Sequence, residues 1–551
     1  MARKLPMGIQ DFKEIREADY LYIDKSEMIS QILLEGAKVY LYTRPRRFGK
    51  SVNLSMLDAF FNLGYPTDNK WFDGLKVSEN EGCLVHKNRY PVIYFDFKEL
   101  GVNDVETFHS DLTDEMCCLY SRYEYLRESD AISDPDKDFF NKVMRCEVNH
   151  IRLRKAISRL SHMLRKHHGR NVVMLFDEYD NPIHNAYGKP FLPYIIQTMK
   201  DILSSALKGN GSLRFGVVTG VMQVSKESIF SGLNNLSVKN ILSRDFDEMF
   251  GFTDDEVRSI LEEYGYPEKY DEAKDWYDGY RFGDADIYNP WSLLNYVKSG
   301  FVPDTYWAGT SGNSIIDIFF DIADDRMLND LRSLALDVPV VKNINTTVTF
   351  SDLDNDVDNI YSIMVMSGYL KALRHDGGHV VALPNGEMSK VFGEVVASKI
   401  SRTYGCRDTL VMVRGLLEAM VDNDIDRLEH SLYRIFADTL GSIMLDNERV
   451  YQTFLTALLM LSSGRYSVTA EFENGNGRYD IMLRSNSPMS PHVLIELKHS
   501  TDKACMQADA EKALAQIEDR DYAHGLGGRV VMFGIAFNGK MPKVVSRIRE
   551  R

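Results

Sequence analysis

A run of apolar, β-prone residues, KVYLYT (38–43), leads directly into RPRRFGKS (44–51). VNLSMLDAFF (52–61) follows with the apolar spacing of a helix. A buried strand, a tight loop and a helix in this order are the context that a phosphate-binding loop (P-loop) requires, because backbone N–H groups then converge on anionic oxygens. The sequence therefore predicts an α/β fold with a P-loop at the end of one strand.

Three further apolar runs resemble buried strands: PVIYFDF (91–97), NVVMLFDEYD (171–180) and LRFGVVTG (213–220). Long segments with helical spacing separate them. This alternation predicts a parallel sheet covered by helices. The sequence contains no apolar stretch close to the ~18 residues that a membrane-spanning helix needs. We therefore expect an intracellular, cytoplasmic protein with no membrane partner.

The loop itself departs from the standard pattern, because Arg44 stands where the first glycine is expected. The second half of the pattern is complete. Lys50 is placed to reach the β- and γ-phosphates of ATP, and Ser51 offers a hydroxyl to Mg²⁺. A Gly-Lys-Ser tripeptide that occurs by chance is the alternative. The predicted ATP-binding residues of the loop are Arg44, Pro45, Arg46, Arg47, Phe48, Gly49, Lys50 and Ser51.

Two adjacent acids end the run at 171–180, about 125 residues after the loop. We expect Asp177 to hold Mg²⁺ together with Ser51, and Glu178 to polarise the water that attacks ATP. The alternative is that the two acids are solvated side chains after a buried strand and have no catalytic role. Thr219 ends the run at 213–220 and is a candidate sensor of the γ-phosphate, although capping of its strand is nearly as good an explanation.

The C-terminal part predicts a second α/β unit. A helix (447–463) precedes a hairpin (465–484) whose turn is NGNG, and a strand (492–499), a helix (about 503–519) and a strand (528–538) follow. The order is α-β-β-β-α-β. We interpret the last residues, KVVSRIRER, as a basic tip at the solvated end of a helix.

This part carries a second chemical pattern. Glu496 lies 16 residues after Asp480, and Lys498 comes two residues later on the same face of its strand. Two carboxylates can hold a divalent metal that activates water for phosphodiester hydrolysis, and the lysine can orient that water or offset negative charge. The predicted metal ligands are thus Asp480 and Glu496, with Lys498 as a catalytic residue. Auxiliary roles are open to Glu471 and Gln516. Acids and lysines that simply face solvent are the alternative.

The strings LPMGIQDF, YLYIDKS, VYLYTRPRRFGKS, FDEYDNP, SGLNNLS and FGFT resemble the predicted AAA-ATPase-like family of bacteria over residues 5–290. Members of that family also have arginine at the position of Arg44. The resemblance implies that Tyr22, Asp24 and Lys25 lie near the nucleotide.

The strings EFENGNGRYDIML, VLIELK, ALAQI and VVMFGIAFN resemble the PD-(D/E)XK nuclease-like domain that commonly follows in the same family, over residues 445–540. The resemblance implies a restriction-endonuclease-like α/β fold. Domains of this kind can be inactive, but the three core residues are present here.

Charge is uneven along the chain, whose net charge is -15. Residues 1–60 hold 10 basic against 8 acidic side chains, and residues 441–551 hold 14 against 13, so the excess of acid lies between them. A uniformly basic nucleic-acid binder is therefore excluded. The two segments with chemical motifs are the least acidic, which is compatible with polyanionic ligands.

Together these patterns predict three parts. They are an AAA-ATPase-like P-loop domain (1–250), a helical, winged-helix-like middle region (251–440) and a PD-(D/E)XK nuclease-like domain (441–551). We expect ATP and Mg²⁺ as cofactors, with Mn²⁺ an option at the nuclease site, and ATP-gated cleavage of DNA or RNA. The alternative is a nucleotide-controlled switch or assembly protein whose nuclease-like domain only binds. A homo-oligomer is compatible with either function.

Overall fold

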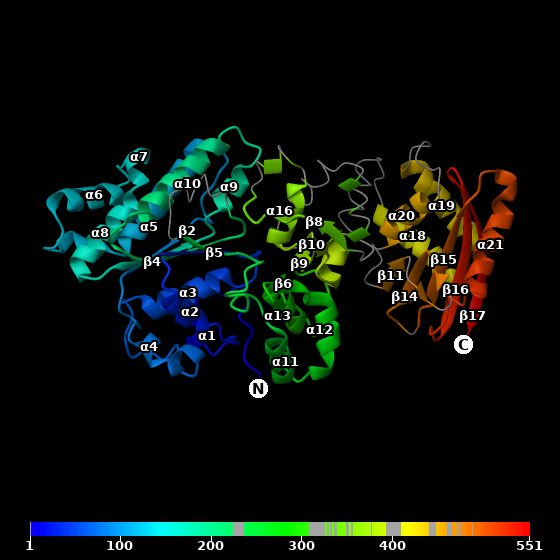
Figure 1. Cartoon of the computed structure of the whole chain (residues 1–551), viewed down its shortest axis with the longest axis horizontal. Helices are drawn as coiled ribbons and strands as arrows, with labels where there is room; N and C mark the ends of the chain where they lie inside the picture. The colour runs from blue at the N-terminus through cyan, green and yellow to red at the C-terminus, as the bar shows by residue number, and fades with distance from the viewer. Residues whose placement is uncertain are drawn as a thin grey trace. The chain divides into compact units, whose positions relative to one another are not determined.

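The computed structural model describes residues 2–223, 236–307, 339–348, 358–375, 377–392, 409–439, 448–459, 465–470, 477–487 and 489–550, with short pieces between 326 and 356 and at 473–474. They fall into two compact units (Figure 1). The first comprises Met1–Ser311 and Val341–Asn385, and the second comprises Gly312–Val340 and Gly386–Arg551. The three-part division of the sequence stays a prediction.

The first unit is built on a five-stranded parallel sheet in the order β2-β3-β4-β1-β5. The strands are β1 (Val39–Thr43), β2 (Val92–Asp96), β3 (Val172–Asp177), β4 (Leu213–Gly220) and β5 (Leu236–Lys239). Every residue of β1 and β3 is buried, which explains why these segments are apolar without alternation. The predicted parallel sheet is confirmed, and the carboxyl ends of its strands meet at one edge.

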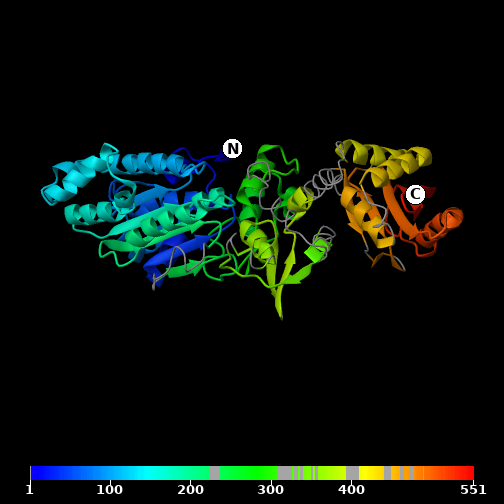
Figure 2. The same cartoon turned by 90° about the horizontal axis from the view of Figure 1, so that it is seen from above.

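Helices cover both faces of this sheet (Figures 1 and 2). α2 (Glu27–Glu35) and α3 (Lys50–Phe61) lie on one face, while α5 (Val105–Ser121), α8 (Ala156–His168) and α10 (Leu192–Leu207) lie on the other. The shorter helices are α1 (Phe12–Glu17), α4 (Glu81–Leu84), α6 (Asp134–Met144), α7 (His150–Leu153) and α9 (Asn181–Ala186). α3 begins where β1 and its loop end and packs on β2, β3 and β4.

A helical segment follows the sheet, in agreement with the predicted helical middle region. It consists of α11 (Asp254–Glu263), α12 (Tyr270–Tyr277), a small hairpin of β6 (Tyr280–Phe282) and β7 (Ala285–Ile287), and α13 (Pro290–Lys298). Thr253 caps α11 in a reciprocal capping box with Glu256. Later in this unit come β8 (Val340–Lys342), α16 (Asn359–Ser367), β9 (Lys371–His375) and β10 (Gly378–Ala382).

The second unit contains a mixed five-stranded sheet in the order β11-β14-β15-β16-β17. β11 (Tyr466–Ala470), β14 (Ile481–Ser485), β15 (His492–His499), β16 (Arg529–Asn538) and β17 (Met541–Glu550) form it, and β12 (Glu473–Asn474) pairs with β13 (Gly477–Arg478) nearby. α18 (Thr409–Asp422), α19 (Ile425–Thr439) and α20 (Glu448–Leu459) lie on one face, and α21 (Met506–Asp519) lies on the other (Figure 1). The predicted α-β-β-β-α-β order is confirmed.

The C-terminal basic tip is a strand, and its interpretation as a helix end was wrong. β17 pairs antiparallel with β16 from Met541 to Glu550. The two adjacent β-branched residues Val544 and Val545 favour a strand, and Val544 is buried in the sheet's core. Isolated basic residues in an edge strand also protect it from pairing with other chains.

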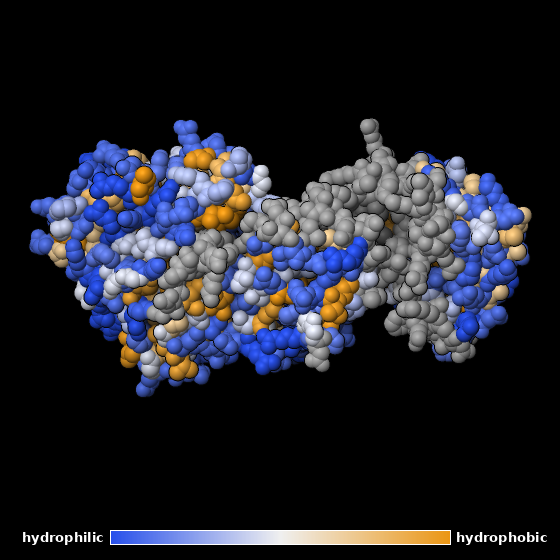
Figure 3. Space-filling model, turned by 45° about the horizontal axis from the view of Figure 1, so that its top comes forward, coloured by the Kyte–Doolittle hydropathy of each residue, from blue (hydrophilic) through white to orange (hydrophobic). Residues whose placement is uncertain are grey.

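Among the described residues, no helix is long and apolar enough to cross a membrane. On the face shown in Figure 3, hydrophilic residues predominate and apolar residues form small scattered patches.

Candidate active sites

The P-loop joins the end of β1 to the start of α3. Gly49 is the residue before α3 and has a left-handed φ of 83°, a conformation that favours glycine. Arg47 is also left-handed, with φ 71°. This turn brings the loop to the N-terminus of α3, where the first backbone N–H groups have no partner within the helix. Helix N-termini of this kind, here at Gly49, Lys50 and Ser51, are positions at which proteins commonly bind anions.

Arg44 is fully buried, and its guanidinium group binds the protein backbone. It donates to the carbonyl oxygens of Thr43 (2.9 Å), Lys239 (2.8 Å) and Phe246 (3.2 Å). It also lies over the rings of Phe250 and Phe282, at 5.0 and 5.1 Å. Burial lowers the pKa of Arg44 to about 10, so the group stays charged near neutral pH. The side chain thus ties the loop to the segment after β5, and any contact of Arg44 with phosphate would come from its backbone.

Restoring the standard glycine should therefore harm this protein. The change Arg44→Gly would leave three carbonyl oxygens without their donor and open a cavity, so we expect a loss of about 3 kcal/mol or more in the free energy of unfolding. Urea denaturation beside Arg46→Gly measures it. The Arg46 side chain is only half-buried, so its removal should cost less than about 1 kcal/mol. Equal stability of the two variants would contradict the structural role of Arg44.

Residues that follow the sheet hold the other side of the loop. Phe48 is buried against the rings of Tyr280 and Phe282, and its carbonyl accepts from the N–H of Gly251 at 3.1 Å. Gly251 has φ 80°, and a Cβ there would lie 2.2 Å from Ile287 Cγ2, so only glycine fits. Trp307 Nε1 donates to the carbonyl of Arg46 at 3.2 Å. The loop is therefore fixed from both of its sides.

Lys50 is buried and sits inside the loop. Its Nζ donates to the carbonyls of Pro45 (3.0 Å) and Arg44 (3.2 Å) and lies 3.9 Å from Glu178 Oε1. The opposite charges of Lys50 and Glu178 face each other at the carboxyl edge of the sheet. The sequence placed these two residues in one site, and the structure brings them together.

The acids at the ends of β2 and β3 form one cluster. Asp177 is fully buried and accepts from the hydroxyl of Thr219 and, at 3.4 Å, from Tyr94 OH. β4 lies between β1 and β3, which is why Thr219 reaches Asp177. Thr219 thus positions this acid. Glu178 has a left-handed φ of 51°, and burial raises the pKa of its carboxyl group.

Asp96 and Tyr94 belong to this cluster although the sequence reasoning did not select them. Asp96 ends β2 in register with Asp177. Burial, and then the charge of Asp177, raise the pKa of Asp96 to about 7. The signal was present, because Asp96 stands near the end of the apolar run at 91–97, as Asp177 follows the apolar residues of the run at 171–180.

A cavity of about 480 Å³ opens beside the loop. The wall on the side of the loop contains Arg46, Arg47, Phe48, Gly49, Lys50, Ser51 and Glu178. Its apolar wall includes Ile9, Leu21, Ile23, Phe252, Trp291 and Leu294. The guanidinium of Arg47 lies 4.4 Å from the centre of the Trp291 ring. Arg44, Pro45, Asp177 and Thr219 are not among the residues that line this cavity.

The resemblance placed three N-terminal residues near this cavity. Tyr22 and Lys25 line it, and Lys25 is bound to Glu256 at 2.7 Å and to the carbonyl of Glu248 at 2.7 Å. Asp24 does not line it. Its carboxylate accepts from the N–H groups of Ser26 (2.8 Å) and Lys76 (2.7 Å), so it fixes the chain that leads to α2.

In the second unit, Asp480 and Glu496 meet at adjoining strands. Asp480 directly precedes β14, and its Oδ2 accepts from the N–H of Leu497 in β15 at 2.7 Å. The N–H of Asp480 donates to Glu496 Oε2 at 3.3 Å. Only 2% of Glu496 is exposed. The pairing of β14 with β15 thus joins two residues that are 16 positions apart.

Lys498 and Gln516 complete this cluster. Lys498 Nζ lies 3.6 Å from Glu496 Oε1, and Gln516 in α21 donates to the same oxygen. Gln516 also donates to Tyr522 OH at 3.4 Å. Gln452 in α20, which the sequence reasoning missed, donates to the carbonyl of Asp480 at 3.3 Å. Glu471 lies outside the described residues.

The comparisons with known proteins agree with this division of sites. Residues 6–230 match the family model described as predicted AAA-ATPase, and residues 446–547 match the PD-(D/E)XK nuclease superfamily. A relative from Azotobacter chroococcum mcd 1, described as an uncharacterized protein in the vnfD 5′ region, is 31% identical over 570 residues, which covers 100% of this chain and 99% of the relative. The chain belongs to the predicted AAA-ATPase family. The resemblance found in its sequence is confirmed.

The side chains of this AAA-ATPase-like protein fit the groups that the two families generally use. The P-loop cavity combines α3's N-terminus, a lysine and a hydroxyl with an apolar wall, which suits a triphosphate joined to a base. The partly buried Asp480 and the buried Glu496 suit a divalent cation that prefers oxygen ligands. Among the described residues, no group of three or more His, Cys, Asp or Glu side chains has metal-binding geometry, so protein side chains would supply only part of any coordination shell.

Proposed function

We propose that this protein binds and hydrolyses ATP at the P-loop cavity, and that its second unit cleaves DNA or RNA with a divalent metal under the control of the bound nucleotide. The observation that carries the proposal is that each unit holds a charge-matched cluster suited to one phosphate reaction. Lys50 faces Glu178 in the first unit, and Lys498 faces Glu496 in the second.

At the P-loop cavity, the N-terminus of α3 and Lys50 bind the phosphates of ATP, and Ser51 and Asp177 would hold Mg²⁺. Bound Mg²⁺ neutralises charge on the phosphates. Thr219 and Tyr94 keep Asp177 oriented. Glu178 accepts the proton of the attacking water, and its raised pKa makes it a better base than an exposed carboxylate. Arg46, Arg47 and Phe48 shape the loop around the nucleotide.

In the second unit, Asp480 and Glu496 would hold the metal, and Lys498 would orient the attacking water or stabilise negative charge on the phosphate. Bound Mg²⁺ or Mn²⁺ polarises the phosphate and lowers the pKa of a water molecule bound to the metal. Gln516 fixes one oxygen of Glu496, so the other stays directed toward Asp480. Nucleic acid is the partner that this chemistry requires.

The second candidate is a nucleotide-controlled switch whose nuclease-like unit binds without cutting. The small number of acids at the second site favours it, since only two carboxylates converge there among the described residues. A cytoplasmic location, assembly into a homo-oligomer and the division at 1–250, 251–440 and 441–551 are compatible with both candidates and form part of the proposal.

A cleavage assay with the full chain separates the candidates. Plasmid, linear DNA and RNA are incubated with Mg²⁺ or Mn²⁺, with and without ATP, and with a chelator as the control. We expect cutting that depends on the metal and changes with ATP. ATP hydrolysis without cutting of any substrate would favour the switch.

A further inference from the structure

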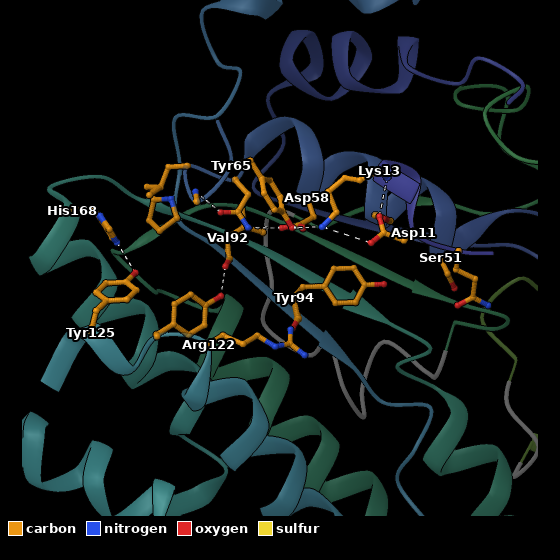
Figure 4. Close-up of a pocket in the computed structure, with 17 residues that line it drawn as sticks. Asp11, Lys13, Ser51, Asp58, Tyr65, Val92, Tyr94, Arg122, Tyr125 and His168 are labelled. Carbon is orange, nitrogen blue, oxygen red and sulfur yellow. Dashed lines mark hydrogen bonds and ion pairs between the residues drawn. The ribbon is translucent and has the colours of Figure 1, made fainter. Parts of the chain in front are cut away.

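A second cavity of about 480 Å³, the same volume as the P-loop cavity, lies at the outer edge of β2. Figure 4 shows side chains of α3 and the turn after it, including Ser51, Asp58 and Tyr65, opposite Tyr94, Arg122, Tyr125 and His168. Ser51 lines both cavities, so the two lie on either side of the start of α3. Apart from Ser51 and Tyr94, the residues that line it have no role in the proposed ATPase reaction.

The cavity is lined by two cations, Lys13 and Arg122, and two carboxylates, Asp11 and Asp58, and the charge of Arg122 acts on Asp58. Lys13 Nζ lies 3.6 Å from Asp11 Oδ2. Asp58 accepts from Asn62 and Tyr65, both at 2.8 Å, and burial raises the pKa of its carboxyl group. Arg122 donates only to the backbone carbonyl of Tyr94 at 3.3 Å, and no carboxylate among the described residues forms an ion pair with it. An anion in this cavity would therefore meet a guanidinium group with spare donors.

Aromatic rings supply most of the remaining surface. Tyr65, Tyr94, Tyr123 and Tyr125 line the cavity. His168 Nε2 is 2.8 Å from Tyr125 OH, and burial lowers the pKa of His168, so this histidine contributes a neutral hydrogen-bonding ring at pH 7. Rings beside an arginine with spare N–H donors are a combination that suits the base and the phosphate of a nucleotide.

An extended peptide is a poorer fit. A peptide that added to β2 would need the free carbonyls of this edge strand. The carbonyl of Val92 accepts from Tyr123 OH, and that of Tyr94 accepts from Arg122. These two side chains occupy the positions that an additional strand would use.

We propose that this cavity binds one nucleotide unit, with Arg122 on the phosphate and the tyrosine rings on the base. The unit is either a free mononucleotide or one residue of a single strand. Tyr94 lines the cavity and also donates to Asp177 Oδ2. A bound nucleotide unit would therefore contact a residue that orients Asp177, the proposed Mg²⁺ ligand. This coupling rests on the proposed ATPase, whereas binding does not.

Binding is measured with the full chain in the Glu496→Gln background, which prevents cleavage, and with the P-loop filled by a non-hydrolysable ATP analogue. The probes are a fluorescent nucleoside monophosphate and a fluorescent tetranucleotide. We expect Arg122→Ala and Tyr125→Ala each to weaken binding by about tenfold. Arg127→Ala is the matched control, since Arg127 is nearby but paired with Glu124 at 2.7 Å. Tyr125→Phe keeps the ring and should keep binding.

Tighter binding of the tetranucleotide identifies a strand as the ligand, and equal or tighter binding of the monophosphate identifies a free nucleotide. Failure of both probes to bind, or equal effects of Arg122→Ala and Arg127→Ala, would overturn the proposal. The coupling between this cavity and ATP hydrolysis is measured separately. The better probe should change the ATP hydrolysis rate of the wild type by about fivefold and leave the Arg122→Ala rate unchanged. If the wild type hydrolyses no ATP, the ATPase proposal fails while the binding result stands.

Discussion

Glu496→Gln is expected to reduce nucleic-acid cleavage by at least about 10²-fold while the protein stays folded. Glutamine has the shape of glutamate but lacks the charge that a metal ion requires. Glu496 is buried, accepts a hydrogen bond from the N–H of Asp480 and lies beside Lys498. Removal of its negative charge therefore affects both of these residues. Cleavage rates over a range of Mg²⁺ concentrations measure the effect.

The matched control for this change is Glu518→Gln. Glu518 lies in the same unit, in α21, and its carboxylate forms an ion pair with Arg547 on the surface. Exposed pairs contribute little to stability, so this variant should cut like the wild type. If Glu496→Gln also cuts at the wild-type rate, the cluster of Asp480, Glu496 and Lys498 is not the catalytic centre.

Glu178→Gln is expected to lower the rate constant of ATP hydrolysis by about 10²-fold or more and to leave ATP binding nearly unchanged. Glu178 is the acid nearest Lys50, and its raised pKa suits a residue that takes a proton from water. The amide of glutamine keeps the size of the side chain but cannot accept that proton. Single-turnover hydrolysis and equilibrium binding of a labelled nucleotide separate the two quantities.

Glu99→Gln serves as the control for Glu178→Gln. Glu99 lies on the loop after β2 and is 72% exposed, with Lys98 as its ion-pair partner. Its replacement should leave hydrolysis unchanged. A Glu178→Gln variant that hydrolyses ATP normally would remove the general-base role, and one that no longer binds ATP would make Glu178 a binding residue.

Much of the fold followed from local sequence, because buried parallel strands are continuous apolar runs. β1, β3 and β4 were all predicted in this way, with the acids of β3 at the correct edge. The same reasoning failed for β17. The short basic run at 543–551 shows no clear helical or strand periodicity of its apolar residues. Its strand forms by pairing with β16, and local sequence does not specify that partner.

The sites were harder to predict from the sequence than the fold. The pattern identified Arg44 as part of the loop, but it could not show that the guanidinium turns inward to three carbonyls, two of them from residues about 200 positions away. The same limit hid the cavity of Arg122, which is built from α3, β2 and the ends of α5 and α8. Glu496 and Lys498 were easier, since a strand's alternation already places them on one face.

Nucleotide bound at the P-loop is expected to control cleavage by the second unit. The most direct test compares cleavage rates with and without ATP for the wild type and for Lys50→Ala, with Mg²⁺ constant. Lys50 belongs to the first unit and Glu496 to the second, so the variant leaves the nuclease cluster intact. We expect ATP to change the wild-type rate and to have no effect on the rate of Lys50→Ala. If cleavage responds to ATP equally in both proteins, or in neither, nucleotide bound at the P-loop does not control cleavage.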